Sequence, residues 1–530
     1  MPVMTTPRDT YSPRLDVLAF FIILASFLVR YWFVASGQLN LVQDEAQYWD
    51  WIRRPQLSYY SKGPLIAWII SLWTWVFGNT ELGVRFGSIL GMTGIQAALY
   101  VGVSRVWREH RLAVFVLFAA ATMPLLNGLG ILATTDCPLI FFWTVAFFAL
   151  AAATRHDPDR PVSNLPFIIL GLCMAVGILA KYMMLTFLAV ALIYAVILQF
   201  RGQLPKRFWA RFLIAGVIGS AAGLAPIVIW NMDNGWVAYK HVAKLTSGVG
   251  GSDWLPDRIG PFFEMLGAQI GLLAPWWFWF ILAATPAAVR KAWVGPVGRF
   301  DAGYRRDLLS VLFFWPLWGI ITFKALFSKV EANWTAAAFG TAAILAGLAF
   351  KAWWDAPARK TRGRAIMAGV TAILALTIFV SPLLPLPDSM NITLRLKGWA
   401  DLGRKVDDVI NTEFDDPSRV FAMSDNYGFT SELAFYLKGQ PFTFCTWSED
   451  RRMNQYDLWP APGKDKLGWG AVMVRKRFRK SPVPELNKMF EYVSEPIFYS
   501  SSFKGGKGRK FTIIVCKGFT GYWPRHSGRF

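Results

Sequence analysis

Acidic, basic and aromatic side chains are concentrated between Leu41 and Phe77, directly after the first hydrophobic run. The charged members are Asp44, Glu45, Asp50, Arg53, Arg54 and Lys62, and the aromatic members nearest to them are Tyr48, Trp49, Trp51, Tyr59 and Tyr60. Carboxylates can take a proton from a hydroxyl group, and cations can bind an anion. Aromatic rings with a polar tip suit the boundary between lipid and water. The combination predicts an active-site loop on the outer surface of a membrane.

Asp44 and Glu45 are the predicted catalytic acids of this loop. A carboxylate in a partly dehydrated pocket holds a proton more tightly than in water, which suits Asp44 to act as a general base. The simpler alternative is a solvated acidic pair that only keeps the loop outside the membrane. Asp136, in the run TTDCPL, is the third predicted catalytic acid. Its structural alternative is an N-cap at the start of a helix, and the two roles are compatible.

Cationic side chains near the ends of hydrophobic runs predict a site for a phosphate group. The candidates are Lys62, Lys181, Lys240 and His241. Lysines at the ends of spans often only extend to the interface, which is the favoured interpretation for Lys181 alone. Several cations on one face beside carboxylates fit a phosphate-bearing lipid better. The further predicted substrate contacts are Tyr48, Tyr59, Tyr60 and Tyr182.

The composition is that of a membrane protein with several spans. Hydrophobic residues make up 54% of the 530 residues and charged residues 17%, and the apolar residues form long blocks. The formal net charge of +21 comes from basic residues in short loops between these blocks, so we expect no nucleic-acid partner. No zinc-binding pattern and no nucleotide-binding glycine pattern is present. A divalent ion held by the acidic residues stays open, and no other cofactor is expected.

Apolar blocks predict about eleven transmembrane helices. They lie near residues 15–36, 83–105, 112–131, 137–153, 164–180, 182–200, 209–230, 265–289, 306–326, 332–350 and 365–385. The loops after every second block are rich in Arg and Lys, which indicates a cytoplasmic N-terminus. The remaining loops, which carry the predicted site, then face the periplasm or the outside.

A second, smaller unit is expected at the C-terminal end. Residues 1–385 form the predicted transmembrane catalytic domain, with 37–82 as its first outer loop, and residues 386–530 form a periplasmic α/β domain. A helix is predicted at Gly398–Ile410, and strands are predicted at Arg419–Met423, Glu432–Leu437, Phe442–Thr446, Ala471–Arg475 and Phe511–Cys516. A disulfide between Cys445 and Cys516 is left open by the sequence.

Several segments together resemble the bacterial PMT_2-type branch of the C-class glycosyltransferases, which includes the lipid A aminoarabinose transferases and related polyprenyl-phosphate-dependent enzymes. They are DEAQYWDW, SYYSKGPLIAWI, GVRFGSILG, TTDCPLIFFWT, GILAKYMML, PIVIWNMDNGWVAYKHV, KVEANWTAAAF, LKGWADLG and ELAFYL. The resemblance implies a bundle of about 11–13 transmembrane helices with an outward-facing cavity. It assigns Asp44 as the catalytic base and Lys62 as the ligand of the donor phosphate. Many relatives have an acid where this chain has Ser61 and a second proline where it has Gly63, so a metal requirement does not carry over.

The predicted function is that of an inverting glycosyltransferase. The expected donor is a sugar on a polyprenyl phosphate such as undecaprenyl phosphate, and the expected acceptor is an envelope glycolipid such as lipid A. The alternatives are a transporter or flippase for a phosphorylated lipid or sugar and, within the enzyme class, a protein O-mannosyltransferase. Transporters place polar groups near the middle of the membrane and often contain repeats, whereas here the charges lie at one face.

Overall fold

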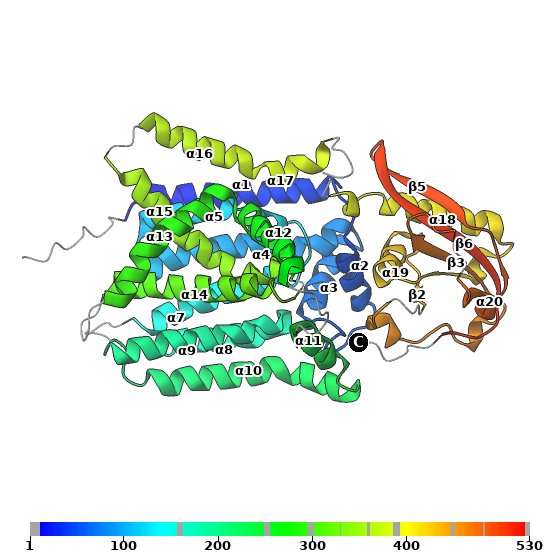
Figure 1. The fold of residues 1–530 in the computed structure, drawn as a ribbon, viewed down its shortest axis with the longest axis horizontal. Coiled ribbons are helices and arrows are strands. Elements are labelled where there is room, and N and C mark those ends of the chain that lie inside the picture. Colours follow the sequence, from blue (N-terminus) through cyan, green and yellow to red (C-terminus); the bar gives the residue numbers. More distant parts are fainter. Residues whose placement is uncertain are drawn as a thin grey trace, which may run out of the picture.

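The computed structural model describes residues 11–155, 163–247, 255–294, 301–328, 330–357, 361–384, 393–446, 451–480 and 483–524. A bundle of long helices makes up most of the molecule, and a smaller sheet-containing domain lies at one end of it (Figure 1). Helix α2 (Gln43–Ile52), which carries the predicted catalytic acids Asp44 and Glu45, lies where the two parts meet. The expected domain boundary between residues 385 and 386 lies outside the described residues and stays a prediction.

The bundle contains helices from both ends of the predicted membrane domain. They are α1 (Pro13–Ala35), α3 (Leu65–Phe77), α4 (Glu81–Val101), α5 (His110–Thr122), α6 (Pro124–Leu129), α7 (Asp136–Ala153), α8 (Leu165–Ala180), α9 (Leu185–Phe200), α10 (Phe208–Asp233), α11 (Val237–Ser247), α12 (Leu255–Leu273), α13 (Pro275–Val294), α14 (Ala302–Lys324), α15 (Phe339–Asp355), α16 (Thr361–Ala375) and α17 (Thr377–Val380). Among the described residues, 8 helical segments are long and apolar enough to cross a membrane, and α3, α5 and α8 are shorter apolar helices.

The block predicted at 265–289 is not one straight span. Helices α12 and α13 meet there at an angle of 94°. Ala274 between them has a positive φ of 72°, and α13 begins with Pro275. Because proline has no backbone N–H to donate, the hydrogen-bond ladder of α12 cannot continue through this point. The pair is therefore a broken span or a re-entrant loop.

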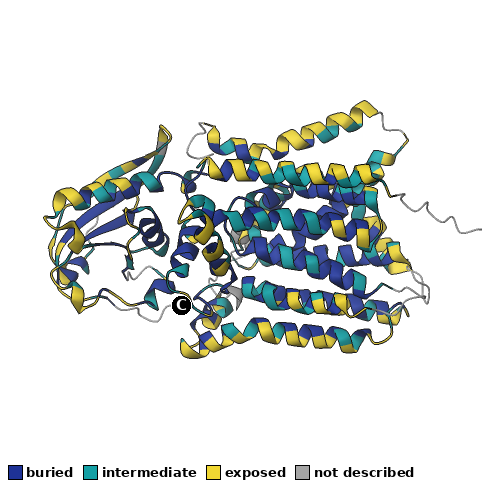
Figure 2. Cartoon of the chain, turned by 180° about the vertical axis from the view of Figure 1, so that it is seen from behind, coloured by how far each residue is buried: buried dark blue, intermediate teal, exposed yellow. Residues whose placement is uncertain are grey.

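Many residues on the outside of the bundle are exposed (Figure 2), and large apolar side chains are among them. Trp143, Trp277 and Phe187 are buried between helices, whereas Phe20 of α1 and Val217 of α10 are more than half exposed. An apolar exterior of this extent suits lipid and is costly in water. The chain is a multi-pass membrane protein.

The C-terminal domain is a mixed α/β unit with a six-stranded sheet. Its helices are α18 (Trp399–Glu413), α19 (Tyr427–Tyr436) and α20 (Leu486–Met489), and its strands are β1 (Val420–Ser424), β2 (Phe444–Cys445), β3 (Gly470–Lys476), β4 (Phe490–Val493), β5 (Ile497–Phe503) and β6 (Gly506–Phe519). The strand order is β2-β1-β3-β6-β4, with β5 also paired to β6. Strand β1 runs parallel to β2 and β3, and the pairs of β6 are antiparallel. The predicted small α/β domain is confirmed.

One predicted strand is wrong and two strands were not predicted. The run Glu432–Leu437 lies mostly in helix α19, because Asn426 accepts backbone N–H bonds from Gly428 and Phe429 and so starts a helix. A short apolar run does not distinguish a strand from a buried helix. The two strands that were not predicted are β4, which has only 4 residues, and β5, in which apolar and polar residues do not alternate clearly.

The two cysteines of this domain do not pair. Cys445 and Cys516 are both buried free thiols. They lie on β2 and β6, three steps apart in the sheet, which corresponds to about 14 Å at the usual strand spacing. The Cα atoms of a disulfide are about 4–7 Å apart.

Candidate active site

Asp44 lies in the first turn of α2, with its side chain exposed. The helix starts there because the next residue, Glu45, accepts a hydrogen bond from the backbone N–H of Val42 at 2.9 Å. One carboxylate oxygen of Asp44 accepts a hydrogen bond of 3.1 Å from the hydroxyl of Tyr427, a residue of the C-terminal domain. Asp44 is therefore oriented by a neutral donor, has no cation bound directly to it among the described residues, and remains accessible.

Glu45 occupies a different environment from its neighbour. Its side chain is completely buried and forms a paired contact with Arg85 of α4, with distances of 2.9 and 2.7 Å from the Arg85 nitrogens Nε and Nη2 to the two carboxylate oxygens. One of these oxygens also accepts the backbone N–H of Ala133 at 2.6 Å. With the bond from Val42, each carboxylate oxygen of Glu45 accepts two hydrogen bonds. Neither oxygen is free to contact a substrate. The geometry favours a structural role for Glu45 over the predicted catalytic one.

Asp136 is the first residue of α7 and is also buried. Its Oδ1 receives the amine of Lys181 at 2.6 Å, and its Oδ2 receives the side-chain amide of Asn333 at 2.7 Å. No side-chain N-cap is formed at this helix start. Asp136 therefore joins the starts of three segments and holds Lys181, which makes it a positioning residue in this geometry.

Lys62 lies beside this ion pair because the chain comes unusually close to α8. A Cβ atom on Gly63 would be only 2.1 Å from the carbonyl oxygen of Leu179, two residues before Lys181. The amine of Lys62 forms no hydrogen bond or salt bridge among the described residues. Burial lowers its pKa, and the charge of Lys181 lowers it further, whereas Asp136 and Asp44 oppose the shift. A half-buried ammonium group without a carboxylate partner is a ready site for an anion.

His241 and Tyr60 form the next part of the site. Their rings are 4.6 Å apart between centroids, and both side chains are buried. Burial lowers the pKa of His241 to about 4, with further contributions from Arg452 and Lys62, so the ring is neutral near pH 7. Lys240 lies apart from this group: its exposed amine donates to the carbonyl oxygen of Gly235 at 2.9 Å. The structure does not bring Lys240 to the other predicted contacts.

The remaining predicted tyrosines differ in position. Tyr48 lies one turn after Asp44, and burial raises its pKa, with Asp44 as the next largest cause. Tyr59 stacks on Trp51 at 4.3 Å and donates its hydroxyl to the Trp51 carbonyl at 3.1 Å, so it supports the loop instead of facing a substrate. Tyr182 follows Lys181 in a short helical turn, Tyr182–Met184, and packs against the bundle core.

The buried imidazole of His241 makes the stability of the protein depend on pH. Between about pH 6.5 and about pH 4, the unfolded chain binds a proton at His241 that the folded chain does not, so the free energy of unfolding falls as the pH is lowered through this range. We expect the thermal midpoint of the purified protein to drop between about pH 7 and about pH 5, and to drop less in His241→Phe. His110→Phe, at the other described histidine, serves as the control. An equal drop in wild type and His241→Phe would contradict the assignment.

Two residues of the site were not predicted from the sequence. They are Tyr427, which donates to Asp44, and Arg452, whose charge lowers the pKa of Lys62 and of His241. Both belong to the C-terminal domain. Their neighbours in sequence carry no signal of a site, and only the docking of this domain brings them to α2.

The chain is similar to known proteins in both sequence and fold. The family model described as dolichyl-phosphate-mannose-protein mannosyltransferase (PMT_2) matches residues 61–230. The lipid A galacturonosyltransferase RgtD of Rhizobium johnstonii is 26% identical over 400 residues, which cover 74% of this chain and 77% of the relative. An undecaprenyl phosphate-alpha-4-amino-4-deoxy-L-arabinose arabinosyl transferase of Photorhabdus laumondii is 24% identical over 52% of this chain and 50% of its own length.

A solved structure shares the whole architecture. The crystal structure of ArnT from Cupriavidus metallidurans bound to undecaprenyl phosphate has a TM-score of 0.63 with this chain and 14% identity, and the match covers 94% of this chain and 97% of that one. The similarity includes both the helical bundle and the C-terminal domain. The chain is a membrane glycosyltransferase that resembles the PMT_2 family. The resemblance predicted from the sequence motifs is confirmed.

The carboxylates of this glycosyltransferase do not form a ready metal site. Among the described residues, no group of three or more His, Cys, Asp or Glu side chains is placed to hold a metal ion. Glu45 and Asp136 already use their oxygens for Arg85, Lys181 and Asn333. Asp44 alone of the predicted acids has accessible oxygens, and a single carboxylate is a poor site for a divalent ion.

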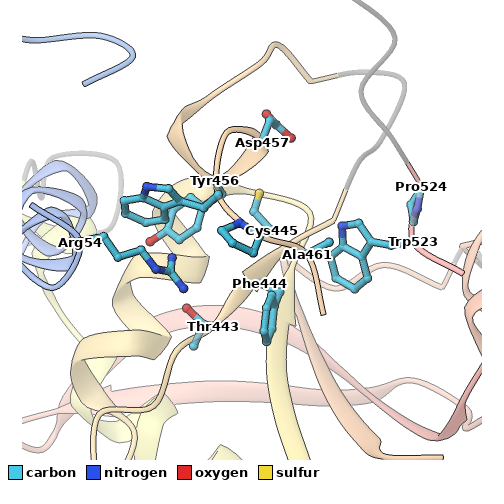
Figure 3. A pocket seen from close by; sticks show the side chains of 11 residues that line it. Arg54, Thr443, Phe444, Cys445, Tyr456, Asp457, Ala461, Trp523 and Pro524 are labelled. Carbon is cyan, nitrogen blue, oxygen red and sulfur yellow. The ribbon is translucent and has the colours of Figure 1, made fainter. Parts of the chain in front are cut away.

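A pocket of about 350 Å³ opens at the seam between the end of α2 and the C-terminal domain of the glycosyltransferase (Figure 3). Arg54, Tyr456, Trp459 and Trp523 are among the residues that line it. None of the predicted catalytic or binding residues does. Asp44 lies at the other end of α2, in its first turn.

Proposed function

We propose that this glycosyltransferase moves a sugar from a polyprenyl-phosphate donor, such as undecaprenyl phosphate, to an envelope glycolipid such as lipid A. The single observation that carries the proposal is that an accessible carboxylate, Asp44, lies near a half-buried ammonium group, Lys62, that has no salt bridge among the described residues. Two similar proteins support the substrate class. RgtD is a lipid A galacturonosyltransferase, and ArnT was crystallised with undecaprenyl phosphate.

In the proposed reaction, Asp44 and Lys62 supply the two groups that the chemistry needs. Asp44 takes the proton of the acceptor hydroxyl, whose oxygen attacks the anomeric carbon of the donor sugar. The bond between that carbon and the phosphate oxygen breaks, its electron pair stays on the phosphate, and the configuration at the carbon is inverted. Lys62 stabilises the additional negative charge on the departing lipid phosphate. Tyr48 and Tyr60 line the same region.

The proposed arrangement in the membrane follows from the position of the site. Helix α2, which carries Asp44, lies with α11 and the sheet domain at one end of the bundle (Figure 1). We place this end at the periplasmic side of the inner membrane and the N-terminus in the cytoplasm, because the loops expected on the opposite side are the basic ones. The charged groups of the proposed site lie at one end of the bundle and not at mid-membrane. This position favours a transferase over a transporter.

The test is transfer of a labelled sugar in membrane vesicles that contain the wild-type protein and a polyprenyl-phosphate-linked donor. Label in the lipid A fraction supports the proposal. Label in the protein fraction would indicate a protein O-mannosyltransferase instead. Movement of intact donor across the vesicle membrane without transfer would indicate a flippase and overturn the proposal.

Loss of the ammonium group at position 62 should weaken donor binding. We expect Lys62→Gln to raise the KM for the donor about 10- to 100-fold, because a hydrogen bond to a charged group is lost. The KM for the acceptor should change little. Lys206→Gln, at an exposed lysine in the loop before α10, is the matched control. A normal donor KM in Lys62→Gln would remove Lys62 from the phosphate site.

A further inference from the structure

The C-terminal domain of the protein forms hydrogen bonds with the segment that carries the predicted site. The hydroxyl of Ser431 in α19 donates to the carbonyl oxygen of Gln43 at 3.2 Å, and the backbone N–H of Tyr60 donates to the side chain of Gln455 at 2.7 Å. Met453 packs with Tyr60 in one buried cluster. The segment that contains Arg452 is therefore fixed against the loop between α2 and α3.

Helix α19 comes close enough to α2 to leave no space for a side chain at Gly428. A Cβ atom there would be 2.6 Å from the side chain of Gln43, the residue before Asp44. This close approach puts the hydroxyl of Tyr427 on Asp44. The charge of Arg452 lowers the pKa of Tyr427, against the larger effects of burial and of Asp44. The guanidinium group therefore lies near the tyrosine that binds the accessible carboxylate.

Arg452 has no salt bridge with a carboxylate among the described residues. Its sequence neighbour Arg451 behaves differently, since it forms two bonds, of 2.7 and 2.5 Å, with the carboxylate of Asp457. Burial raises the pKa of Tyr60, and the charge of Arg452 lowers it in part. The same charge lowers the pKa of Lys62. Arg452 and Lys62 are therefore two cations, one from each domain, that face the same region beside Asp44.

We propose that Arg452 is a second ligand of the donor phosphate and that the C-terminal domain thereby completes the active site. The inference rests on the proposed function. The phosphate of the donor is a diester with one negative charge, and the lipid phosphate that leaves carries two. Lys62 balances the first charge and Arg452 the second. A guanidinium group can hold two phosphate oxygens at once, which suits it to a group that gains charge during the reaction.

The first test compares Arg452→Gln and Arg452→Lys with the matched control Arg419→Gln, an exposed arginine of the same domain, in the full-length protein. We expect Arg452→Gln to lower kcat/KM for the donor about 10- to 100-fold, because charge-assisted bonds are lost. Arg452→Lys should recover part of the loss, since it keeps the charge without the fork of donors. The KM for the acceptor should stay unchanged.

The second test uses undecaprenyl phosphate as the probe, because it has the additional charge of the product. Arg452→Gln should weaken inhibition by this lipid by a larger factor than it raises the KM for the donor. An equal change in both constants, or rates that match Arg419→Gln, would overturn the assignment.

Direct binding of undecaprenyl phosphate, measured by its effect on the thermal midpoint, separates the two proposals. If the wild type transfers no sugar, the proposed function fails, and binding still decides the role of Arg452. A stabilisation by the lipid that is present in wild type and Arg419→Gln but reduced in Arg452→Gln supports the inference. An equal stabilisation in all three, or none in any, contradicts it.

Discussion

Asp44→Asn should abolish sugar transfer while leaving the fold intact. The substitution keeps the shape of the side chain and its bond with Tyr427, because an amide oxygen also accepts from a hydroxyl group. It removes the group that takes the proton, and loss of a general base lowers rates by about 100- to 10,000-fold. The measurement is the rate of transfer of a labelled sugar in membranes, alongside the thermal midpoint of the purified variant.

The matched control for Asp44→Asn is Asp233→Asn. Asp233 is an exposed acid at the end of α10 and has no contact with the site residues among the described interactions. The Asp233→Asn variant should transfer the labelled sugar at the rate of the wild type. If Asp44→Asn also transfers like the wild type, Asp44 is only a solvated acid at the start of a helix, and the catalytic site lies elsewhere.

Substitution of Glu45, the adjacent residue, should have the opposite pattern. Glu45→Ala leaves Arg85 buried without its partner, and a broken buried ion pair costs about 3–5 kcal/mol of stability. We therefore expect a large fall in the thermal midpoint and in the amount of folded protein in membranes. Glu413→Ala, at the exposed end of α18, should change neither.

A double substitution tests whether the cost belongs to the pair. Arg85→Ala should be as destabilising as Glu45→Ala, and the combination should cost clearly less than the sum, because neither charge is then left alone. Recovery will be partial, since Arg85 also donates to the carbonyl oxygens of Leu39 and Asn40. A stable Glu45→Ala protein that no longer transfers sugar would instead restore Glu45 to a catalytic role.

The bundle could be predicted well because each span is a local property of the chain. A run of apolar residues long enough to cross lipid must form a helix, whatever lies beside it, because no water is present to satisfy the backbone. There are two exceptions. The bend at Ala274 depends on one backbone angle next to a proline, and the block predicted at 112–131 is divided into α5 and α6 just before Pro124. The sheet domain was predicted less completely, since Glu432–Leu437 has an apolar pattern that suits both states and Asn426 decides between them.

The residue types at the site were also predictable, whereas their roles were not. Gly63 and Lys62 are adjacent in sequence, but the reason for the glycine is the carbonyl oxygen of Leu179, which only the packed structure brings near. In the same way, Lys240 and His241 are neighbours that face different surroundings, one exposed and bonded to its own loop and the other buried against Tyr60. A helix turns neighbouring side chains to different faces, so adjacency does not decide function.

The sequence by itself determined that this is a membrane protein with acids, cations and tyrosines in its first loop, because hydrophobicity and residue type are carried by each segment alone. The tertiary structure decided which of two adjacent acids is accessible and which is buried. Arg85, 40 positions along the chain, neutralises Glu45, and Tyr427, 383 positions away, orients Asp44 and leaves it accessible. Charge pairing and desolvation depend on distances in space, and the order of residues along the chain does not specify them.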